Sequence, residues 1–256
     1  MDVDVDVISV DRIRKSYGTL VAVDRVSFAV RRGEIFGLIG PNGAGKTTTM
    51  ECITGLRAPD GGQISVLGLD PARDRLALQN RVGVQLQEAQ LQKRIKVWEA
   101  VDFWQTLYPT SVNGDDLLEQ LGLREKRDAW FMTLSGGQKQ RLFIALALIN
   151  DPDVVFLDEL TTGLDPQARR HMWELISSIR DSGATIVLTT HYMEEAEELC
   201  DRVAIMDAGE IVRLGSPAEL VEELLATGFS KDREVRPADL EDVFIHHTGH
   251  ALREDS

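Results

Sequence analysis

The first thirty residues of the chain alternate between apolar and polar positions. From Val3 to Ile13 the two kinds of residue mostly take turns, and Val26, Phe28 and Val30 repeat the same period of two. Successive side chains point to opposite faces of a β-strand, so this pattern is typical of strands with one buried face. Because a turn-like Arg-Arg-Gly follows at 31–33, we expect half-buried antiparallel strands in this region.

A different order of elements is predicted for residues 34–55. Residues 34–39 form a nearly continuous apolar run, 40–45 are rich in glycine, and Lys46 to Ile53 has helical character that stops at Gly55. This predicts a buried strand, a loop and a helix in succession. Two further short strands are expected at Gln63–Leu67 and Val82–Leu86.

The middle of the chain is predicted to be helical. Residues 97–150 lack alternation and are dense in helix-forming residues, with Pro109 and Gly114 as breaks, which indicates a helical insert. After it, apolar runs alternate with helix-patterned stretches in the βαβ rhythm of a buried parallel sheet. The apolar runs are at 153–157, 184–190 and 203–207, and the helical stretches are at 166–180 and 193–200.

The last part of the chain contains a helix-starting motif. Ser216, Pro217 and Glu219 form a capping box with proline at the first helical position, so a short helix should run to about Ala226. A charged linker follows. Leu240, Val243 and Phe244 then predict one or two further amphipathic turns.

Composition narrows the class of protein. A chain of 256 residues fits one domain with subdomains, and its formal charge of -14 would repel a polyphosphate backbone, which disfavours nucleic-acid binding. Its two cysteines, Cys52 and Cys200, are expected to be buried free thiols in a reducing cytosol. The start of the chain has no signal-peptide pattern, and its longest apolar run, Leu142 to Ile149, is too short to span a bilayer. A role at a membrane would therefore require docking on another protein.

Residues 40–47 match the phosphate-loop pattern G-x-x-x-x-G-K-[ST] between a predicted strand and a predicted helix. Glycines in such a loop let backbone N–H groups point at phosphate oxygens, and the helix N-terminus adds positive potential. Lys46 would reach the β- and γ-phosphates, and the Thr47 hydroxyl would bind Mg²⁺.

Two adjacent carboxylates end the predicted strand at 153–157. Asp158 suits a metal ion, and Glu159 suits the positioning or deprotonation of an attacking water. Neighbours on a strand point in opposite directions, so we expect the two to serve different tasks. Acidic residues also cap the helices that follow strands, so this pair alone does not decide between a site and a cap.

A second anion-binding helix end is predicted at Leu134-Ser135-Gly136-Gly137-Gln138. One chain needs only one phosphate loop. Together with residues 40–47, this segment resembles the ATP-binding cassette family, in which such a "signature" closes over the ATP held by the phosphate loop of a second subunit. Without that resemblance, the segment could be a simple helix cap.

The resemblance implies further roles over nearly the whole chain. Tyr17 corresponds to the aromatic residue under the adenine ring, although it could also be an ordinary strand tyrosine. Gln87 resembles the glutamine that senses Mg²⁺, with Gln85 as the alternative. Asp165 resembles the D-loop residue at the dimer interface, and His191 the histidine at the γ-phosphate, although a histidine after a strand is more often a polar surface residue.

The resemblance assigns four groups of residues. The nucleotide-binding group is Tyr17, Gly40, Asn42, Gly43, Ala44, Gly45, Lys46, Thr47 and Thr48. The signature group, facing the opposite subunit's ATP, is Ser135, Gly136, Gly137 and Gln138. The Mg²⁺ group is Thr47, Gln87 and Asp158, and the catalytic group is Lys46, Glu159 and His191.

One position departs from the family pattern, and one segment points to a branch of the family. Leu160 stands where the family commonly has proline, so the following loop is expected to be less stiff. Residues 239–249 resemble the C-terminal element of bacterial ATPases that export drugs, antibiotics or surface polymers. No long regulatory extension of the kind found in many sugar importers is present in the sequence.

These observations predict an α/β phosphate-loop fold with an N-terminal antiparallel subdomain and a helical insert. We expect a nucleotide-binding domain over residues 1–230, with the insert at about 88–150, and a short C-terminal tail over 231–256. The resemblance implies an ATPase that uses ATP and Mg²⁺. Its partners would be a second ATPase subunit, the same or homologous, and an integral-membrane permease at the cytoplasmic face of the cell membrane.

Two other function classes share the same cassette. An ATP-driven clamp on ribosomes or DNA generally carries two cassettes in one chain or a long coiled coil, and neither feature is in this sequence. A nucleotide-binding scaffold without turnover would lack Glu159 or His191. Both residues are present.

Overall fold

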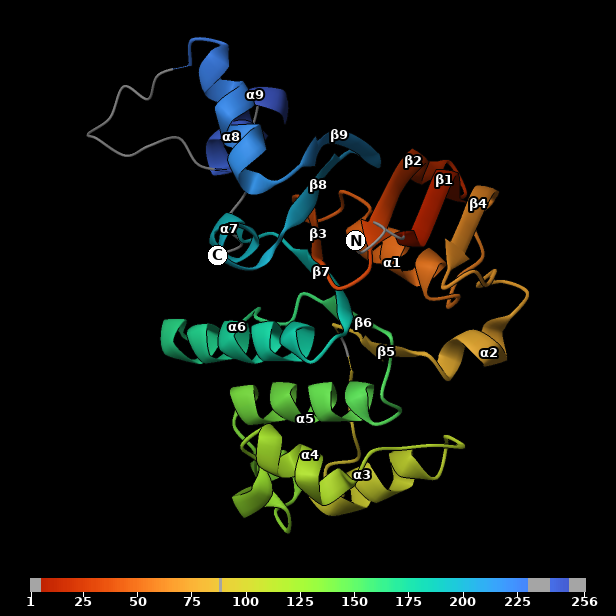
Figure 1. Ribbon diagram of the computed structural model, residues 1–256, viewed down its shortest axis with the longest axis vertical. Coiled ribbons are helices and arrows are strands. Elements are labelled where there is room, and N and C mark those ends of the chain that lie inside the picture. Colours follow the sequence, from red (N-terminus) through yellow and green to blue (C-terminus); the bar gives the residue numbers. More distant parts are fainter. Residues whose placement is uncertain (1–5, 88, 230–239, 249–256) are drawn as a thin grey trace.

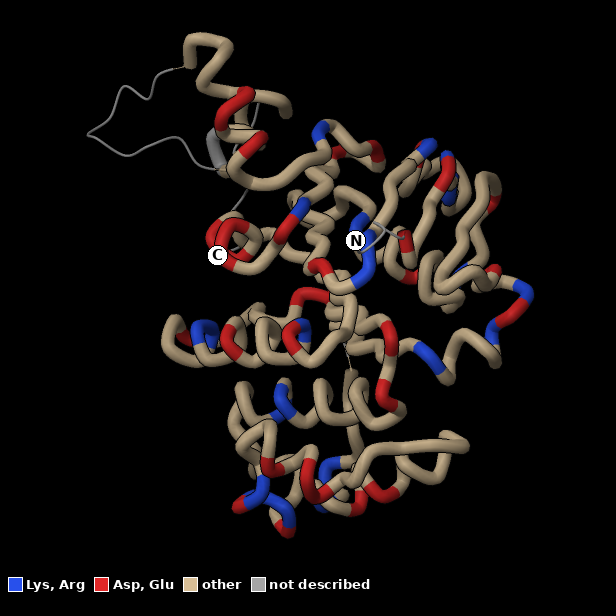
Figure 2. Tube along the Cα trace, in the orientation of Figure 1, with Lys and Arg blue, Asp and Glu red and all other residues tan. Residues whose placement is uncertain are grey.

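The computed structural model describes residues 6–87, 89–229 and 240–248. Two sheets lie side by side, and helices surround the larger one (Figure 1). Acidic and basic residues are interspersed along the outer elements, while most of the central strands are uncharged (Figure 2). No helix in the described part of the chain is both long and apolar enough to cross a membrane.

The smaller sheet is antiparallel, as the alternation predicts. It consists of β1 (Asp6–Tyr17), β2 (Leu20–Arg31) and β4 (Gly61–Val66) in the order β2-β1-β4. Val10 pairs with Phe28 and Ile13 with Val26, so the buried faces of both strands coincide. Strand β4 begins two residues earlier than predicted, and it ends before Leu67 because Leu67 has φ 54°, a left-handed conformation that takes the chain out of the sheet.

The larger sheet carries the parallel strands. Its order is β5-β6-β7-β3-β8-β9, in which β9 alone pairs antiparallel. The strands are β3 (Ile35–Ile39), β5 (Val82–Gln85), β6 (Val154–Asp158), β7 (Thr185–Thr190), β8 (Arg202–Asp207) and β9 (Glu210–Gly215). The five parallel strands confirm the predicted buried sheet. Strand β9 was not predicted; it is an edge strand whose residues are all partly or fully exposed.

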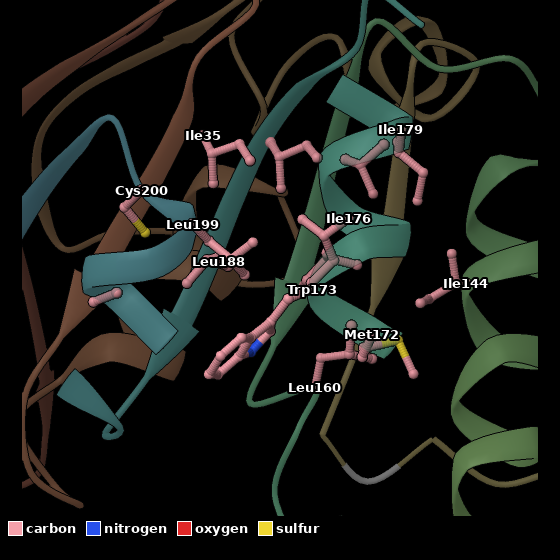
Figure 3. Packing of buried hydrophobic residues seen from close by; sticks show 14 of the residues in the cluster. Ile35, Ile144, Leu160, Met172, Trp173, Ile176, Ile179, Leu188, Leu199 and Cys200 are labelled. Carbon is pink, nitrogen blue, oxygen red and sulfur yellow. The ribbon is translucent and has the colours of Figure 1, made fainter. Parts of the chain in front are cut away.

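Both faces of this sheet are buried, which explains its continuous apolar runs. On one face, Phe36 and Leu38 of β3 pack toward the antiparallel sheet, where Phe28 and Phe36 stack with their centroids 5.1 Å apart. On the other face, Ile35 and Ile39 pack toward the helices that lie between residues 97 and 248. Figure 3 shows part of this second core, in which Leu160 lies near Met172 on α6 (Pro166–Asp181).

Residues 97–150 form the predicted helical insert. It contains α3 (Val97–Gln105), α4 (Gly114–Gln120) and α5 (Gly136–Leu148), with two short 3-10 turns at Arg124–Lys126 and Phe131–Thr133. Helix α5 lies between α6 and the rest of the insert (Figure 1). Its burial against both attaches the insert to the core.

The remaining helices flank the sheets. They are α1 (Lys46–Ile53), α2 (Arg75–Gln79), α7 (Met193–Leu199), α8 (Pro217–Ala226) and α9 (Leu240–Thr248). The Ser216–Glu219 capping box at the start of α8 is confirmed, and in α9 Leu240, Val243 and Phe244 are fully buried. The five-residue helix α2 was not predicted. The predicted linker and most of the predicted C-terminal tail lie outside the described residues, and the division at residue 230 remains a prediction.

The two cysteines are buried free thiols, as predicted. Burial raises the pKa of Cys52 to about 11 and that of Cys200 well above its ordinary value. Neither thiol is activated for nucleophilic chemistry, because such a thiol needs a lowered pKa.

Candidate nucleotide site

The order of the parallel strands determines which loops meet. Strands β6, β7 and β3 are adjacent, and their carboxyl ends lie at one edge of the sheet. The phosphate loop follows β3, Asp158 ends β6 with Glu159 directly after it, and His191 follows β7. Residues more than a hundred positions apart therefore converge at the edge where α/β proteins bind ligands.

The phosphate loop is shaped by its glycines. Gly45 has φ 99°, and a Cβ at this position would lie 2.4 Å from the Ala22 carbonyl oxygen, so only glycine fits. Lys46 is buried, and its Nζ donates hydrogen bonds to the carbonyl oxygens of Gly40 at 2.9 Å and Pro41 at 3.1 Å. Burial lowers the pKa of Lys46, while Glu159 opposes that effect. The ammonium group thus lies folded over its own loop.

The rest of the predicted nucleotide-binding group surrounds this lysine. Asn42 and Gly43 are exposed at the tip of the loop, while Ala44 is buried and its N–H donates to the Pro41 carbonyl at 3.1 Å. Thr47 and Thr48 occupy the first turn of α1 and are half-buried.

Asp158 is buried beside Thr47. The Thr47 hydroxyl is 3.3 Å from Asp158 Oδ1, and Thr189 Oγ1 donates to the same oxygen at 2.5 Å. Burial raises the pKa of Asp158, and the two threonine hydroxyls counteract part of that rise. Thr189 also accepts a hydrogen bond from the Glu159 N–H at 3.0 Å, so it holds both carboxylate residues. Thr189 was not predicted as a site residue, because its only signal in the sequence is its place near the end of an apolar strand.

Glu159 lies at the centre of the site. Its Oε1 is 3.4 Å from Lys46 Nζ and 3.6 Å from His191 Nδ1, and its Oε2 accepts a hydrogen bond from Gln87 Nε2 at 3.0 Å. The His191 ring lowers the pKa of Glu159, helped by Lys46 and opposed by burial. A carboxylate that stays ionised and is surrounded by donors is suited to hold or deprotonate a water molecule.

The side chains of Asp158 and Glu159 point to different groups because the backbone turns between them, not because side chains alternate along a strand. Strand β6 ends at Asp158, and Glu159 has φ 47°, a left-handed conformation that costs about 1–3 kcal/mol in a residue other than glycine. This turn directs Glu159 toward Lys46 while Asp158 faces Thr47. The two side chains therefore face different groups because of the left-handed conformation of Glu159, and not because of the strand alternation that was the predicted cause.

His191 and Gln87 reach the site from neighbouring loops. The His191 side chain is 23% exposed, and its buried Nδ1 has no hydrogen-bond partner among the described residues. Gln87 is exposed and contacts Glu159, whereas Gln85 is buried and donates to the Leu86 carbonyl oxygen. Of the two glutamines, Gln87 is therefore the one that contacts the site.

Tyr17 lies at the end of β1, beside α1. It is 40% exposed, and the Arg57 guanidinium lies 5.2 Å from its ring centroid. Arg57 is in turn hydrogen-bonded to Glu51 on α1 at 2.6 Å. An exposed ring close to the phosphate-loop helix is available for stacking with a planar base.

The signature segment lies apart from the phosphate loop. Ser135 is the N-cap of α5 and forms a capping box with Gln138, and both Ser135 and Gly136 are exposed. The segment borders a cleft of about 760 Å³ whose other walls include residues 163–165 and the first turns of α6. Asp165 caps α6 by accepting a hydrogen bond from the Ala168 N–H at 2.9 Å. No phosphate-loop residue lines this cleft.

The similarity to known proteins agrees with this geometry. Residues 23–162 match the protein family described as ABC transporter. A curated relative, the Nod factor export ATP-binding protein I of Burkholderia orbicola (strain AU 1054), is 44% identical over 245 residues, which cover 92% of this chain and 80% of that protein. The chain belongs to the ABC transporter family. It is an ATP-binding subunit of such a transporter and an ATPase.

Solved members of the ABC transporter family have the same fold. A structure described as an ATP-binding subunit of an ABC transporter superposes with a TM-score of 0.81 at 27% identity and covers 94% of this chain and 99% of its own. The cbiO1 protein of Clostridium perfringens, described as part of the ABC transporter complex cbiONQ, gives 0.77 at 27% identity, with 88% and 93% covered. ABC ATPase subunits work as dimers with a membrane permease.

The residues beside the phosphate loop are compatible with Mg²⁺. Thr47 Oγ1 and Asp158 Oδ1 are hard oxygen ligands 3.3 Å apart. Mg²⁺ in nucleotide sites commonly uses one or two protein carboxylates and takes its remaining ligands from phosphates and water. Such a site does not need a cluster of three or more acidic, histidine or cysteine side chains, and the described residues contain none.

Proposed function

We propose that this chain works as a pair, with two ATP molecules held between two cassettes arranged head to tail. Each site would join Lys46, Asp158, Glu159 and His191 of one chain to Ser135 and Gly137 of the other. The observation that carries the proposal is the separation of the two anion-binding ends within one chain. The signature opens on a cleft that no phosphate-loop residue lines. A second cassette, the same or homologous, would supply the missing partner.

Each residue has one task in this arrangement. Lys46 and the loop N–H groups bind the phosphates, Thr47 and Asp158 hold Mg²⁺, with Gln87 beside them, and Tyr17 stacks against adenine. When bound, Mg²⁺ neutralises charge on the phosphate oxygens. Glu159 orients the attacking water or takes its proton, and His191 lies beside Glu159, where it can also contact the γ-phosphate. Asp165 lies at the interface between the cassettes.

ATP-driven dimerisation tests this proposal. In the Glu159→Gln variant, which should bind ATP without turning it over, we expect ATP but not ADP to produce a dimer in light scattering. The γ-phosphate supplies the anion between two positively polarised helix ends. A monomer at saturating ATP, or an equal dimer with ADP, would contradict the head-to-tail arrangement.

A second substitution locates the contact. Ser135→Glu added to Glu159→Gln should abolish the dimer and leave ATP binding to the phosphate loop intact. Ser216→Glu is the matched control, because Ser216 caps α8 with the same capping box but belongs to neither half of the nucleotide site. Both substitutions replace the same cap. Only Ser135→Glu should prevent dimerisation.

We also propose that the chain drives a separate permease at the cytoplasmic face of the cell membrane, and that the transporter is an exporter. The curated relative named for export supports the direction. Residues 1–230 would form the nucleotide-binding domain, with the insert at about 88–150, and the tail would begin at 231. The absence of nucleic acid among the partners stays a prediction.

The permease would dock along residues 89–97 and the start of α3. Gln87 touches Glu159 at one end of this segment, and the insert begins at the other. Lys93 and Arg94 are exposed, Phe103 is 53% exposed, and Trp98 is half-buried beneath the Arg127 guanidinium. Loss of the γ-phosphate would change the surroundings of Gln87 beside Glu159 and Mg²⁺, and this change would be transmitted to the permease, as in other nucleotide switches.

A charge-reversed pair tests the dock. Lys93→Glu with Arg94→Glu should retain ATP binding but abolish co-purification with the permease and transport. Arg73→Glu with Arg75→Glu, which reverses two exposed charges in and before α2, is the control and should assemble normally. Normal assembly and transport by the Lys93 and Arg94 double variant would place the dock elsewhere.

A further inference from the structure

Tyr192, the residue directly after His191, contacts two planar groups, the His191 ring and the Arg169 guanidinium. Its ring centroid lies 4.2 Å from that of His191 at a tilt of 40°. The Arg169 guanidinium carbon lies 4.3 Å from the centroid of the Tyr192 ring. The backbone is fixed as well, because the Tyr192 N–H donates to Thr190 Oγ1 at 3.0 Å. The aromatic ring therefore lies between a cation and the histidine of the site.

Arg169 belongs to the first turn of α6, directly after the segment at 163–165. Its N–H donates to the Asp165 carbonyl at 2.9 Å, the first intrahelical bond after the Asp165 cap. Its Nε is buried and has no hydrogen-bond partner among the described residues. A guanidinium group with a desolvated, unpaired N–H interacts more strongly with an aromatic face than an exposed one does.

A buried glutamate on α7 links that helix to α6. Glu195 on α7 is 2% exposed and accepts a hydrogen bond from Trp173 Nε1 at 3.2 Å. Figure 3 shows the Trp173 indole extending from α6 toward the end of α7, where Leu199 and Cys200 lie. Burial raises the pKa of Glu195, and hydrogen bonds from two threonines and Trp173, together with the charge of Arg169, oppose that rise. The hydrogen bond from Trp173 to Glu195 joins α6 to α7, next to the contact between Arg169 on α6 and Tyr192 just before α7.

We infer that Arg169 and Tyr192 are positioning residues that hold the His191 ring against Glu159. The contacts run from the start of α6 through Arg169 and Tyr192 to His191, which is 3.6 Å from Glu159. Displacement of the 163–165 segment would therefore move His191 relative to the carboxylate that handles the water. A simple packing role for the same contacts would stabilise α6 against α7 without affecting turnover.

This inference rests on the proposed role of His191 in hydrolysis, so its test includes a measurement that does not depend on turnover. The chain has five histidines, and the His191 ring signals in a ¹³C–¹H spectrum can be assigned with His191→Gln. Tyr192→Leu should shift the His191 signals, because the ring current of Tyr192 is lost. Tyr192→Phe keeps the ring and should leave them in place. Arg169→Gln should shift them through movement of the Tyr192 ring.

Turnover should follow the same pattern. In Tyr192→Leu and Arg169→Gln we expect kcat to fall about ten- to hundredfold, since a small misplacement of a reacting group costs that much. The KM for ATP should stay within about twofold, as should both parameters in Tyr192→Phe and in Arg170→Gln, which alters the exposed neighbouring arginine.

The outcomes separate the two proposals. Near-normal kcat in Tyr192→Leu and Arg169→Gln, or a fall in kcat with unchanged His191 signals, overturns the positioning role. A fall in Tyr192→Phe equal to that in Tyr192→Leu also overturns it. If the parent protein turns over ATP no faster than Glu159→Gln, the proposed function fails instead, and the ring signals still report the contact between Tyr192 and His191.

Discussion

The glycines of the phosphate loop and those of the signature are constrained in different ways. A Cβ at Gly40 would lie 2.1 Å from the Met206 carbonyl oxygen and one at Gly45 would lie 2.4 Å from that of Ala22, and both residues have positive φ. Gly136 and Gly137 occupy ordinary helical positions, where an added Cβ would have its nearest neighbours 3.9 Å away. The fold of the chain itself thus requires glycine at 40 and 45 but does not require it at 136 and 137.

This difference bears on where each half of the site is completed. The phosphate-loop half is formed within one chain, where Lys46 already contacts Glu159 and two carbonyl oxygens. The signature half is exposed, and its side-chain hydrogen bonds are those of the capping box between Ser135 and Gln138 at the start of α5. Small residues that their own chain does not need are best explained by close approach of something outside it, such as the nucleotide of a second cassette.

The largest effect is expected from Glu159→Gln, which removes one carboxylate charge from the phosphate-loop half and keeps the shape of the side chain. Turnover should fall about 10²–10⁴-fold, the usual contribution of a general base, while ATP binding persists. Steady-state phosphate release is the measurement.

Glu34→Gln is the matched control for that variant. Glu34 is 8% exposed against 7% for Glu159, and it also pairs with a cation, Arg202 at 3.2 Å. Glu34 precedes β3, however, whereas the phosphate loop follows that strand. The five residues of β3, about 16 Å, therefore lie between Glu34 and the loop. Glu34→Gln should turn over ATP nearly normally. Equal losses in the two variants would mean that Glu159 acts through stability alone.

The next largest effect is expected from Gly45→Ala. The substitution forces a side chain against the Ala22 carbonyl and into a left-handed conformation, which should cost about 1–3 kcal/mol of folding free energy. Denaturant unfolding measures this loss, and nucleotide titration should show weakened ATP binding. An undisturbed ATP affinity would mean that the loop can rearrange without affecting phosphate contacts.

Gly137→Ala should have the opposite combination of effects. Alanine is the better helix former by up to about 1 kcal/mol, so folding stability should stay equal or rise. ATP binding to the isolated chain should be unchanged. Turnover should nevertheless fall about tenfold or more, because the methyl group displaces the partner's nucleotide. Parent-like turnover would show that no nucleotide approaches this helix end.

The smallest effect concerns pH. The folded-state pKa of Glu159 is lowered, so its carboxylate stabilises the fold above the unfolded-state pKa of about 4.3, and this contribution is lost as the pH falls through the lower folded value. The difference in unfolding free energy between parent and Glu159→Gln should therefore shrink on acidification below about pH 5.

Glu34 should behave in the opposite way. Burial raises the pKa of Glu34, so the folded state binds its proton more tightly and the parent gains stability relative to Glu34→Gln as the pH falls. Unfolding curves for the three proteins between about pH 4 and pH 7 measure both slopes. Parallel curves for the two variants would contradict the opposite pKa shifts.

The sequence was sufficient to identify the elements whose pattern is strong. Alternation predicted β1 and β2, continuous apolar runs predicted four of the five parallel strands, and the capping box predicted α8, while β5 was expected only as a short strand. Short or mostly exposed elements were missed, namely α2 and β9, because they bury too little surface to leave a pattern. Motif spacing likewise selected Gln87 over Gln85, and the contact with Glu159 agrees with that choice.

Tertiary structure decided what no local pattern contains. The strand order brings Thr189, Asp158 and Glu159 together from two strands, and the left-handed conformation of Glu159 turns its carboxylate toward Lys46. The contact of Arg169 with Tyr192 likewise joins α6 to the residue that precedes α7, two places that are separate in the sequence. A motif specifies local backbone geometry and side-chain chemistry, because these depend on near neighbours. Which distant side chains meet depends on how the whole core packs, and that is determined only when the sheet is assembled.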